Sequence, residues 1–380
     1  MKVLVLYDYP PTPGGLATQG DLLYKGLLAN GVDAHAVHVD SLLEKEWYYK
    51  WFKPDVVVGT GFWGHTPQLV LHPHRFGIKA IPWLVADGYI CNYQPVLNAL
   101  PLILVTSNWV KEMYMRDGIK GDHIEVLPVG CDTDTFKPYS ENDPKILSVR
   151  SALGIRPDEQ MILTIGGDAA SKGGREVMEA LAAAGNDLPP WKYVCKVWPQ
   201  PRTTIQCNAD KLLAEELGIS EHVSFHTSII SRQFIPYLIG ACDVYAAPSR
   251  LEGFGMPQVE AGACGKPVIG INAMGMLDTL VHEQTALLAG ISERIAVNEV
   301  TIGPESGYGE NHKIFFDVPR TVDYRANVTD IKESLIRLMN SSDLRQQLGN
   351  AGRERVIEHF DYRNVAAKFI KIASERLNIT

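Results

Sequence analysis

A chain of 380 residues exceeds what one typical hydrophobic core holds, and it predicts about two domains of ordinary size. With 46% hydrophobic residues, 21% charged residues and a net charge of -8, the composition is that of a globular enzyme and does not favour binding to nucleic acid or to an anionic membrane. No apolar run approaches the roughly 20 residues that a membrane span requires, and the opening residues 1–7 are too few for the hydrophobic region of a signal peptide.

Cysteine usage indicates a reducing compartment. The six cysteines are scattered along the chain, without a Cys-x-x-Cys pair and without histidines at metal-ligand spacing. This pattern predicts reduced, partly buried thiols rather than a zinc site or a disulfide framework. We therefore expect a cytoplasmic protein.

Short apolar runs alternate with helical patterns from the first residues onward, which is typical of a parallel α/β architecture. The first strand is expected at Val3–Tyr7, followed by a Pro/Gly loop and a helix at about 18–29. The remaining strands of this first series are predicted at 34–39, 54–58, 80–85 and 102–106.

The pattern loosens near residues 143–157, and a second series of strands then begins. These strands are predicted at 161–165, 192–197, 223–225, 243–247 and 267–270. Residues 290–330 are turn-rich and show no clear period, so they are interpreted as an insertion. We expect one domain over 1–150, a second over 151–358, and a last helix within 359–380.

Two acids, Glu252 and Glu260, flank a Gly-Phe-Gly turn where a strand ends and a helix begins. Ligands of open α/β sheets bind at the carboxyl ends of strands, and a glycine-rich turn before a helix favours an anion. Two carboxylates beside an anion site need hydroxyl donors as partners. The pattern therefore indicates a ligand that combines phosphates with sugar hydroxyls, such as a nucleotide sugar; the alternative is a capped surface helix with solvated acids.

Pro248–Val268, which contains this turn, resembles the Glu-x7-Glu signature of retaining glycosyltransferases of the GT-B fold, family 4. Pro10–Gly15 resembles the N-terminal glycine loop of that family, and Ser171–Gly174 resembles the lysine loop that opens its second domain. Residues 105–136 resemble the end of its first domain. The resemblance covers nearly the whole chain apart from about 290–330.

The resemblance implies an α/β fold with two doubly wound Rossmann-like domains that face a central cleft and a C-terminal helix that crosses back to the first domain. It implies transfer of a hexose from a nucleotide-diphosphate sugar, such as UDP-glucose or GDP-mannose, to an acceptor hydroxyl with retention of configuration. The resemblance implies no metal and no cofactor. The first domain would bind the acceptor, which we expect to be small or a saccharide rather than a lipid.

The resemblance also implies roles for individual residues. Glu260 would bind the ribose hydroxyls, Glu252 would lie against the donor sugar, and Lys172 would neutralise the leaving diphosphate. Gly14 and Gly15 would let the first domain approach the phosphate or the acceptor. The backbone N–H groups expected to hold the sugar and the diphosphate belong to Gly253, Phe254, Gly255 and Met256. The residues expected to read the base through their backbone lie between Thr227 and Ile230.

This chain departs from the family in two places. The arginine that usually precedes the lysine by five residues is replaced by Gly167. Arg175 is our candidate substitute, Lys196 a weaker one, and a solvated helix position is the alternative for Arg175. Where the family often carries a histidine that faces the sugar, this chain has Asp87, which would orient a hydroxyl or cap the next segment. His65 is the other candidate for that place.

Several alternatives stay open. Gly59–Gly64 with Asp87 imitates a dinucleotide fingerprint, although it does not follow the first strand. A sugar-nucleotide epimerase or a non-catalytic nucleotide-sugar-binding relative would share the fold. The aromatic helix around Glu46–Phe52 is predicted to bury Leu43, Trp47 and Trp51, against insertion into a membrane interface or stacking on an acceptor sugar. A homo-oligomer and peripheral membrane association also stay open, and the insertion would cover the cleft or contact another subunit.

Overall fold

The computed structural model describes residues 1–86 and 88–379, apart from the side chains of residues 201–203 and Glu305. The chain forms two compact units. Unit 1 comprises Met1–Asp132, Ala296–Val322 and His359–Thr380, and unit 2 comprises Thr133–Ile295 and Asp323–Glu358. The first division therefore lies after Asp132, earlier than the boundary at 150 that the sequence pattern suggested, and the middle of the insertion belongs to unit 1.

Unit 1 is built on a six-stranded parallel sheet with the order β2-β1-β3-β4-β5-β6. Its strands are β1 (Lys2–Tyr7), β2 (Asp33–His38), β3 (Val56–Phe62), β4 (Lys79–Val85), β5 (Ile103–Val105) and β6 (Ile124–Val126). Its helices include α1 (Gly15–Ala29), α2 (Leu42–Trp51), α3 (His72–Arg75), α4 (Gln94–Asn98) and α5 (Asn108–Arg116). The central strands are buried on both faces, which explains their unbroken apolar sequences.

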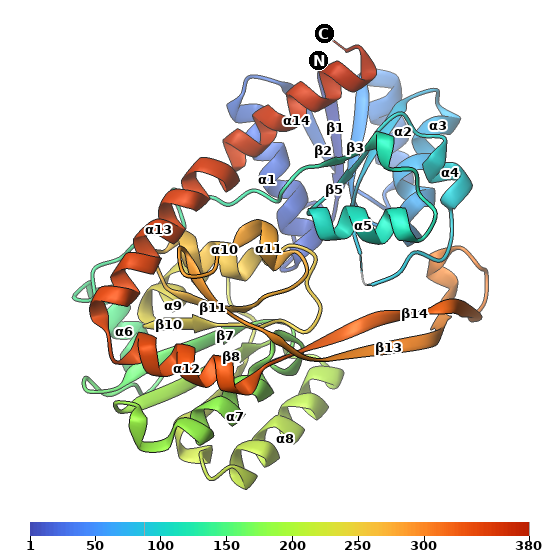
Figure 1. Cartoon of the computed structure of the whole chain (residues 1–380). Helices are drawn as coiled ribbons and strands as arrows, with labels where there is room; N and C mark the ends of the chain where they lie inside the picture. Colours follow the sequence, from blue (N-terminus) through green and yellow to red (C-terminus); the bar gives the residue numbers. More distant parts are fainter. Residues whose placement is uncertain (87, 380) are drawn as a thin grey trace. The chain divides into compact units, whose positions relative to one another are not determined.

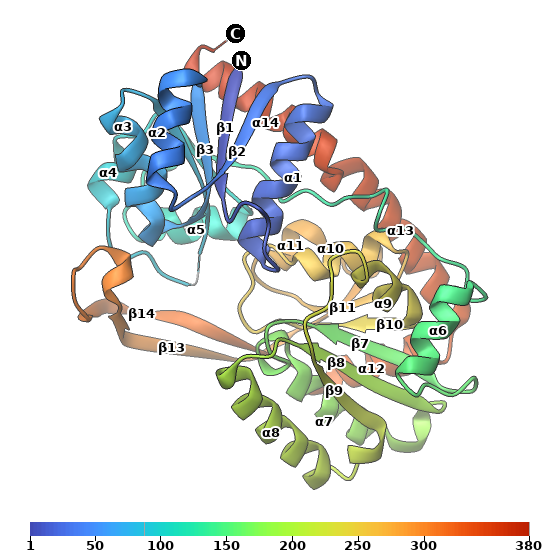
Figure 2. The same cartoon turned by 180° about the vertical axis from the view of Figure 1, so that it is seen from behind.

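The last helix, α14 (Tyr362–Leu377), lies beside α1 in both views of unit 1 (Figures 1 and 2). Val365, Ala366 and Phe369 on its inner side are buried. A Cβ on Gly26 of α1 would lie 2.5 Å from the carbonyl oxygen of Tyr362, so only glycine permits this approach. The predicted return of the C-terminal helix to the first domain is confirmed.

Unit 2 contains a second six-stranded parallel sheet with the order β12-β11-β10-β7-β8-β9. Its strands are β7 (Gln160–Ile165), β8 (Trp191–Val197), β9 (Val223–Thr227), β10 (Val244–Ala246), β11 (Val268–Ile271) and β12 (Ala286–Ala289). The strand order reverses between the neighbours β7 and β10. That reversal is the topological switch point, where the loops after two adjacent strands diverge and leave room for a ligand.

Helices cover both faces of this second sheet. One face carries α7 (Gly174–Ala184), α8 (Pro201–Glu216) and α12 (Val328–Met339), and the other carries α9 (Ile235–Ala241), α10 (Met256–Ala263) and α11 (Met276–Thr279) (Figures 1 and 2). The remaining helices are α6 (Pro144–Ala152) and α13 (Ser342–Phe360). The apolar pattern predicts every strand of the two sheets except β6 and β12, which have three and four residues.

The insertion is not the irregular segment that its sequence suggested. Residues 290–330 contain two long strands, β13 (Ile291–Ile302) and β14 (His312–Ala326), which pair in a two-stranded ribbon (Figure 1). Most of the ribbon's side chains are exposed or half-buried, so no face of it needs an unbroken apolar stripe. That is why the segment lacks the alternation by which strands are predicted.

The end of the ribbon is bound within unit 1. The hydroxyl of Tyr308 donates to the carbonyl of Cys91 at 2.5 Å. Arg320 donates to the carboxylate of Asp117 at 3.0 Å. Cys91 lies in the stretch that follows β4, and Asp117, directly after α5, accepts the backbone N–H of Ile90 in that stretch at 2.8 Å. The ribbon therefore packs against the loop after β4. The carboxyl end of β4 is also where the sequence placed Asp87, which lies outside the described residues.

Helix α2 shows the opposite orientation to the predicted one. Leu43, Trp47 and Trp51 were expected to be buried, but their side chains are 84%, 51% and 58% exposed. The helix buries Lys45 and Tyr49 instead. Burial of Lys45 is possible because its ammonium donates to the carbonyl oxygen of Val39, the residue after β2, at 2.5 Å. The apolar stem of the lysine can therefore pack inward.

The glycines of Gly59–Gly64, the segment that resembles a dinucleotide-binding fingerprint, have a packing role. Gly59 and Gly61 lie inside β3 rather than in the turn after it. A Cβ on Gly59 would lie 2.4 Å from the side chain of Leu69, and one on Gly61 would lie 2.6 Å from the ring of His65. A dinucleotide fingerprint needs its glycines in the loop between strand and helix. These glycines instead let the following helical turns pack against β3.

The described cysteines are all free thiols, and five of the six are buried, as expected from their scattered positions. Over residues 1–86 and 88–379, no helix combines the length and the apolarity that crossing a bilayer requires.

Candidate functional site

The loops after β7 and β10 meet at the switch point of unit 2. The backbone N–H of Arg250 donates to the carbonyl of Ser171 at 2.9 Å, which joins the two loops directly. Gly173 has a φ of +78°, and a Cβ there would lie 2.3 Å from the carbonyl oxygen of Pro248. Glycine is therefore required both for the backbone conformation and for the close approach. The two loops form one structure at the carboxyl edge of the sheet.

This structure brings together Lys172 and Glu252, which lie 80 residues apart in the sequence. The ammonium of Lys172 donates to Oε2 of Glu252 at 2.5 Å, and the two side chains are 19% and 15% exposed. Oε1 of Glu252 accepts the backbone N–H of Gly255 at 3.1 Å. The carboxylate is thus fixed by one cation and one amide, and the ion pair remains reachable from solvent.

Gly166 makes room for the lysine. A Cβ at this position would lie 2.5 Å from Cγ of Lys172. The neighbouring Gly167, the position at which the resemblance led us to expect an arginine, faces open space, since a Cβ there meets nothing within 4 Å. The two consecutive glycines therefore have different roles: the first shapes the path of Lys172, and the second leaves a vacant position beside it.

Helix α10 supplies the second predicted acid. Gly255 caps the helix in the left-handed region at φ 92°, and Pro257 follows in its first turn. A Cβ on Gly275 would lie 2.1 Å from the carbonyl oxygen of Gly253, so the loop after β11 supports the glycine turn from behind. Glu260 lies one turn into the helix and is only 5% exposed. A buried carboxylate at this depth needs a partner.

That partner is Arg232, which the sequence analysis did not identify. Its guanidinium donates to Oε1 of Glu260 at 2.5 Å. The guanidinium carbon also lies 4.6 Å from the centre of the Phe136 ring. Arg232 belongs to the loop between β9 and α9, and no spacing in the sequence links it to Glu260. The one signal that could have found it is chemical, since a buried acid calls for a cation from a nearby carboxyl-end loop.

The loop that carries Arg232 begins where the base-reading residues were predicted. Thr227 is the last residue of β9 and is exposed, and Ile230 in the following loop is half-buried. Both therefore lie at the same sheet edge as the two acids. Through Arg232 this loop is connected to Glu260. The role of Thr227 and Ile230 in reading a base stays a prediction.

The candidate substitutes for the missing arginine are held elsewhere. Arg175 donates to Asp210 of α8 at 2.7 Å. Lys196 is 5% exposed, and burial lowers the pKa of its ammonium. A third cation, Arg250, lies two residues before Glu252 and pairs with Glu176 of α7 at 2.8 Å. In this structure Lys172 is the cation that contacts Glu252, and Arg232 is the one that contacts Glu260.

The predicted residues of unit 1 also lie at a carboxyl edge. Gly14 and Gly15 open α1 directly after the loop that follows β1, and a Cβ on Gly15 meets nothing within 4 Å. His65 lies in a short turn after β3, with its ring 4.4 Å from that of Phe62. Burial lowers the pKa of His65, which favours the neutral imidazole at pH 7. Since β1 and β3 are neighbours in the sheet, these positions share one edge.

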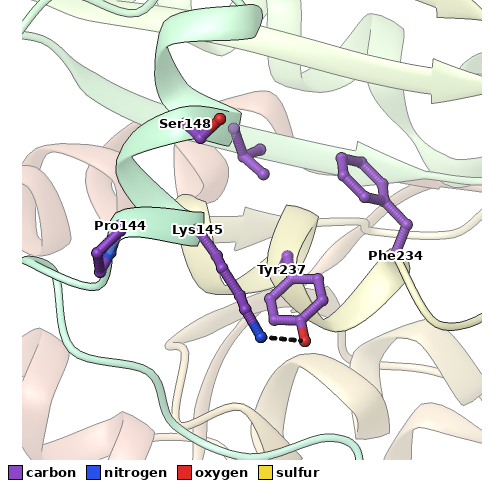
Figure 3. Close-up of a pocket in the computed structure, with 6 residues that line it drawn as sticks. Pro144, Lys145, Ser148, Phe234 and Tyr237 are labelled. Carbon is purple, nitrogen blue, oxygen red and sulfur yellow. Dashed lines mark hydrogen bonds between the residues drawn. The ribbon is translucent and has the colours of Figure 1, made fainter.

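A separate hollow on unit 2 does not belong to this site. It lies between α6 and α9, and its lining residues are Pro144, Lys145, Ser148, Val149, Phe234 and Tyr237. Figure 3 shows Lys145 pointing toward Tyr237, whose hydroxyl it contacts at 3.1 Å. None of the predicted site residues lines this hollow. Among the described residues, no group of three or more His, Cys, Asp or Glu side chains is arranged to hold a metal ion.

Comparison with known sequences identifies the segment that carries the site. Residues 147–299 match the family model described as glycosyl transferases group 1. The chain is 31% identical over 190 residues to the D-inositol 3-phosphate glycosyltransferase of Mycobacterium marinum, a match that covers 50% of this chain and 38% of the relative. The enzyme of the same name from Mycobacterium tuberculosis strain F11 is 31% identical over 195 residues, and this match covers 50% of this chain and 37% of the relative. The match thus spans well under half the length of these curated relatives.

Solved structures resemble the chain over its whole length. A glycosyltransferase from Rickettsia africae superimposes with a TM-score of 0.76 at 17% identity and covers 100% of this chain and 99% of its own. HepE of Anabaena, in complex with UDP and glucose, superimposes with a TM-score of 0.74 at 15% identity, and the match covers 99% of this chain and 100% of HepE. Sucrose-phosphate synthase from Thermosynechococcus elongatus superimposes with a TM-score of 0.74 at 17% identity, and the match covers 100% of both chains. At such identities the likeness shows the fold.

Proposed function

We propose that this chain moves a hexose from a nucleotide-diphosphate sugar to an acceptor hydroxyl, with retention of configuration and without a metal ion. The match of residues 147–299 to the model of group 1 glycosyl transferases and the GT-B fold of the two Rossmann-like units support this proposal. The observation that carries this proposal is the convergence of Glu252, Glu260 and Lys172 at the switch point of unit 2. Two carboxylates, a lysine and a glycine turn suit a ligand that has sugar hydroxyls on both sides of a diphosphate.

Glu260 is the acid for the ribose. It is buried at the start of a helix, and its Oε1 is held by Arg232. Its second oxygen, Oε2, accepts a ribose hydroxyl in the proposed complex. A carboxylate that is already desolvated loses little hydration when the nucleotide binds, so the hydrogen bond to the hydroxyl contributes more of its strength to affinity.

Lys172 provides the main chemical assistance. Negative charge develops on the diphosphate as the bond to the sugar breaks, and a fixed cation at that place lowers the barrier. In the present structure its ammonium is bound to Glu252. Donor binding would move the ammonium to the diphosphate and free Glu252 to accept hydroxyls of the hexose. The departing phosphate oxygen then takes the proton of the acceptor hydroxyl as that hydroxyl's oxygen bonds to the sugar carbon.

The comparisons support a choice among donors and acceptors. HepE has been solved with UDP and glucose and with UDP-glucose, and we propose UDP-glucose as the first donor to test, with GDP-mannose next. The curated relatives are named for D-inositol 3-phosphate, a small hydroxylated acceptor. This favours a small or saccharide acceptor over a lipid, in line with the sequence-based expectation.

Ligand binding and product release test the proposal together. UDP-, GDP- and ADP-sugars are screened by thermal shift, because a ligand that binds only the folded state raises its melting temperature. At least one should raise it, and Glu260→Ala should abolish the increase. Glu283→Ala, which removes an exposed acid paired with Arg337 in the same unit, serves as the matched control. An unchanged shift in Glu260→Ala contradicts the assignment.

Product analysis separates the enzyme from the two related alternatives. A transferase releases nucleoside diphosphate and forms a glycosylated acceptor. An epimerase returns an altered sugar nucleotide, and a non-catalytic relative binds the donor but releases nothing. The position of Lys172 beside Glu252 supports catalysis over mere binding. In the proposed complex its ammonium would reach the diphosphate and assist its departure.

A further inference from the structure

The base of the β13–β14 ribbon is bonded to the loop that carries Glu252. The backbone N–H of Tyr324 in β14 donates to the carbonyl oxygen of Arg250 at 2.7 Å. Arg250 lies two residues before Glu252, and its own N–H donates to the carbonyl oxygen of Ser171, the residue before Lys172. The same residue is therefore bonded on one side to the ribbon and on the other side to the loop of Lys172.

Ion pairs accompany this backbone contact. Oε1 of Glu176 in α7 accepts the Nε–H of Arg250 at 3.0 Å and an Nη1–H of Arg325 in β14 at 3.3 Å. Nη2 of Arg325 also lies 3.0 Å from Oδ2 of Asp323. The side chains of Arg250 and Glu176 are only 12% and 7% exposed. Two acids and two arginines thus balance in charge at a largely buried place, where the loss of one member is costly.

The contribution of Arg325 comes from the inserted ribbon. Residues of about 290–330 are the part of the chain to which the family resemblance does not extend, so the motif around Glu252 does not supply this support. Residues 323–326, at the base of β14, belong to unit 2 together with the loop that they contact. The ribbon base is therefore an extra support for a loop that the motif alone would leave to its own contacts.

We propose, resting on the function proposed above, that Arg325 is a positioning residue for the transfer step. It acts through Glu176, which orients Arg250, and Arg250 in turn holds Glu252 beside Lys172. A group that stabilises developing charge is effective only when it is fixed in place, and a displacement of about 1 Å can cost a hundredfold in rate. The inserted ribbon thereby maintains the geometry of the Lys172–Glu252 pair.

Steady-state kinetics test this role in the reaction. Release of nucleoside diphosphate from UDP-glucose and from GDP-mannose is measured with D-inositol 3-phosphate, the compound for which the curated relatives are named, as the acceptor. Arg325→Ala should lower kcat by roughly tenfold to a hundredfold. It should change the KM of the donor by less than about threefold, because Glu260 and its proposed ribose contact lie outside the cluster.

Lys313→Ala is the matched control. Lys313 pairs with Glu299 within the same ribbon, and both side chains are largely exposed. This variant removes a cation and an ion pair from the ribbon without touching its base, so it should keep the kinetics of the wild type.

Two further measurements separate positioning from a general loss of stability. Glu176→Gln weakens the link through which Arg325 acts, so the double variant Glu176→Gln/Arg325→Ala should lower kcat by less than the product of the two single effects. Hydrogen exchange without any ligand should become faster in residues 249–255 of Arg325→Ala, and it should not change there in Lys313→Ala.

Other outcomes overturn the inference. An unchanged kcat in Arg325→Ala, or an equal loss in Lys313→Ala, refutes the positioning role. Independent effects in the double variant would show that Arg325 does not act through Glu176. A higher KM at unchanged kcat would assign Arg325 to donor binding instead. A wild type that releases no nucleoside diphosphate from either donor refutes the proposed function, whereas unchanged exchange in residues 249–255 refutes the support of the loop, so the two failures are distinct.

Discussion

At the scale of single residues, the site consists of acids that are already paired with cations. Glu252 is bound by Lys172 and Glu260 by Arg232. The first three of these residues were predictable because each lies in a short motif whose spacing has a physical reason. Arg232 was not, because its partner is 28 residues away in the sequence and is reached only when the loop after β9 folds over α10. Contacts of that kind are set by the tertiary structure.

The two consecutive glycines before the lysine loop give a prediction at this scale. Gly166→Ala would place a Cβ 2.5 Å from Cγ of Lys172 and displace the ammonium from Glu252. We expect turnover to fall about a hundredfold, comparable to the loss of one group that stabilises developing charge. Gly167→Ala, where a Cβ meets nothing within 4 Å, should have a far smaller effect. Steady-state release of nucleoside diphosphate measures both variants, and equal losses would contradict this role for Gly166.

At the scale of elements, the sequence predicted all strands of the two sheets except β6 and β12, but it predicted neither the β13–β14 ribbon nor the orientation of α2. Buried parallel strands carry unbroken apolar runs because both faces are covered, and those runs mark them in the sequence. The β13–β14 ribbon has no buried face to enforce a period. Helix α2 has apolar side chains on two sides, and the pattern alone selected the wrong side. Its buried side carries Lys45, a residue that no apolar stripe would include.

Lys45 makes the stability of the protein depend on pH in a way that can be checked. Burial lowers the pKa of its ammonium to about 8, opposed only in part by Asp40, against 10.5 in its ordinary state. Between these values the unfolded chain binds a proton that the folded chain has lost, so stability rises with pH across this window. Lys45→Met removes that contribution.

Urea unfolding at pH 7.5, 8.5 and 9.5 measures this effect. The free energy of unfolding of the wild type should increase relative to that of Lys45→Met as the pH rises. Lys50→Met, which replaces an exposed lysine of the same helix, should follow the wild type. A constant difference between the wild type and Lys45→Met over this range would show that Lys45 titrates normally.

At the scale of the whole molecule, the sequence predicted two doubly wound units and a helix that returns to the first, and it was right about both. It could not predict how the chain is divided between them. The chain passes from one unit to the other after Asp132, Ile295, Val322 and Glu358. A linear pattern shows where strands begin and end, but not with which sheet an inserted ribbon packs. Side-chain contacts of the ribbon, such as Arg320 with Asp117, decide that.

The central claim is that a nucleotide sugar is held at the carboxyl edge of the unit 2 sheet, and hydrogen exchange with and without UDP or GDP tests it most directly. We expect the nucleotide to slow exchange in residues 166–175, 227–235 and 249–263. These segments contain the loop of Lys172, the loop between β9 and α9, and the glycine turn between Glu252 and Glu260. Protection confined to Gly59–Gly64, with these three segments unchanged, would contradict it.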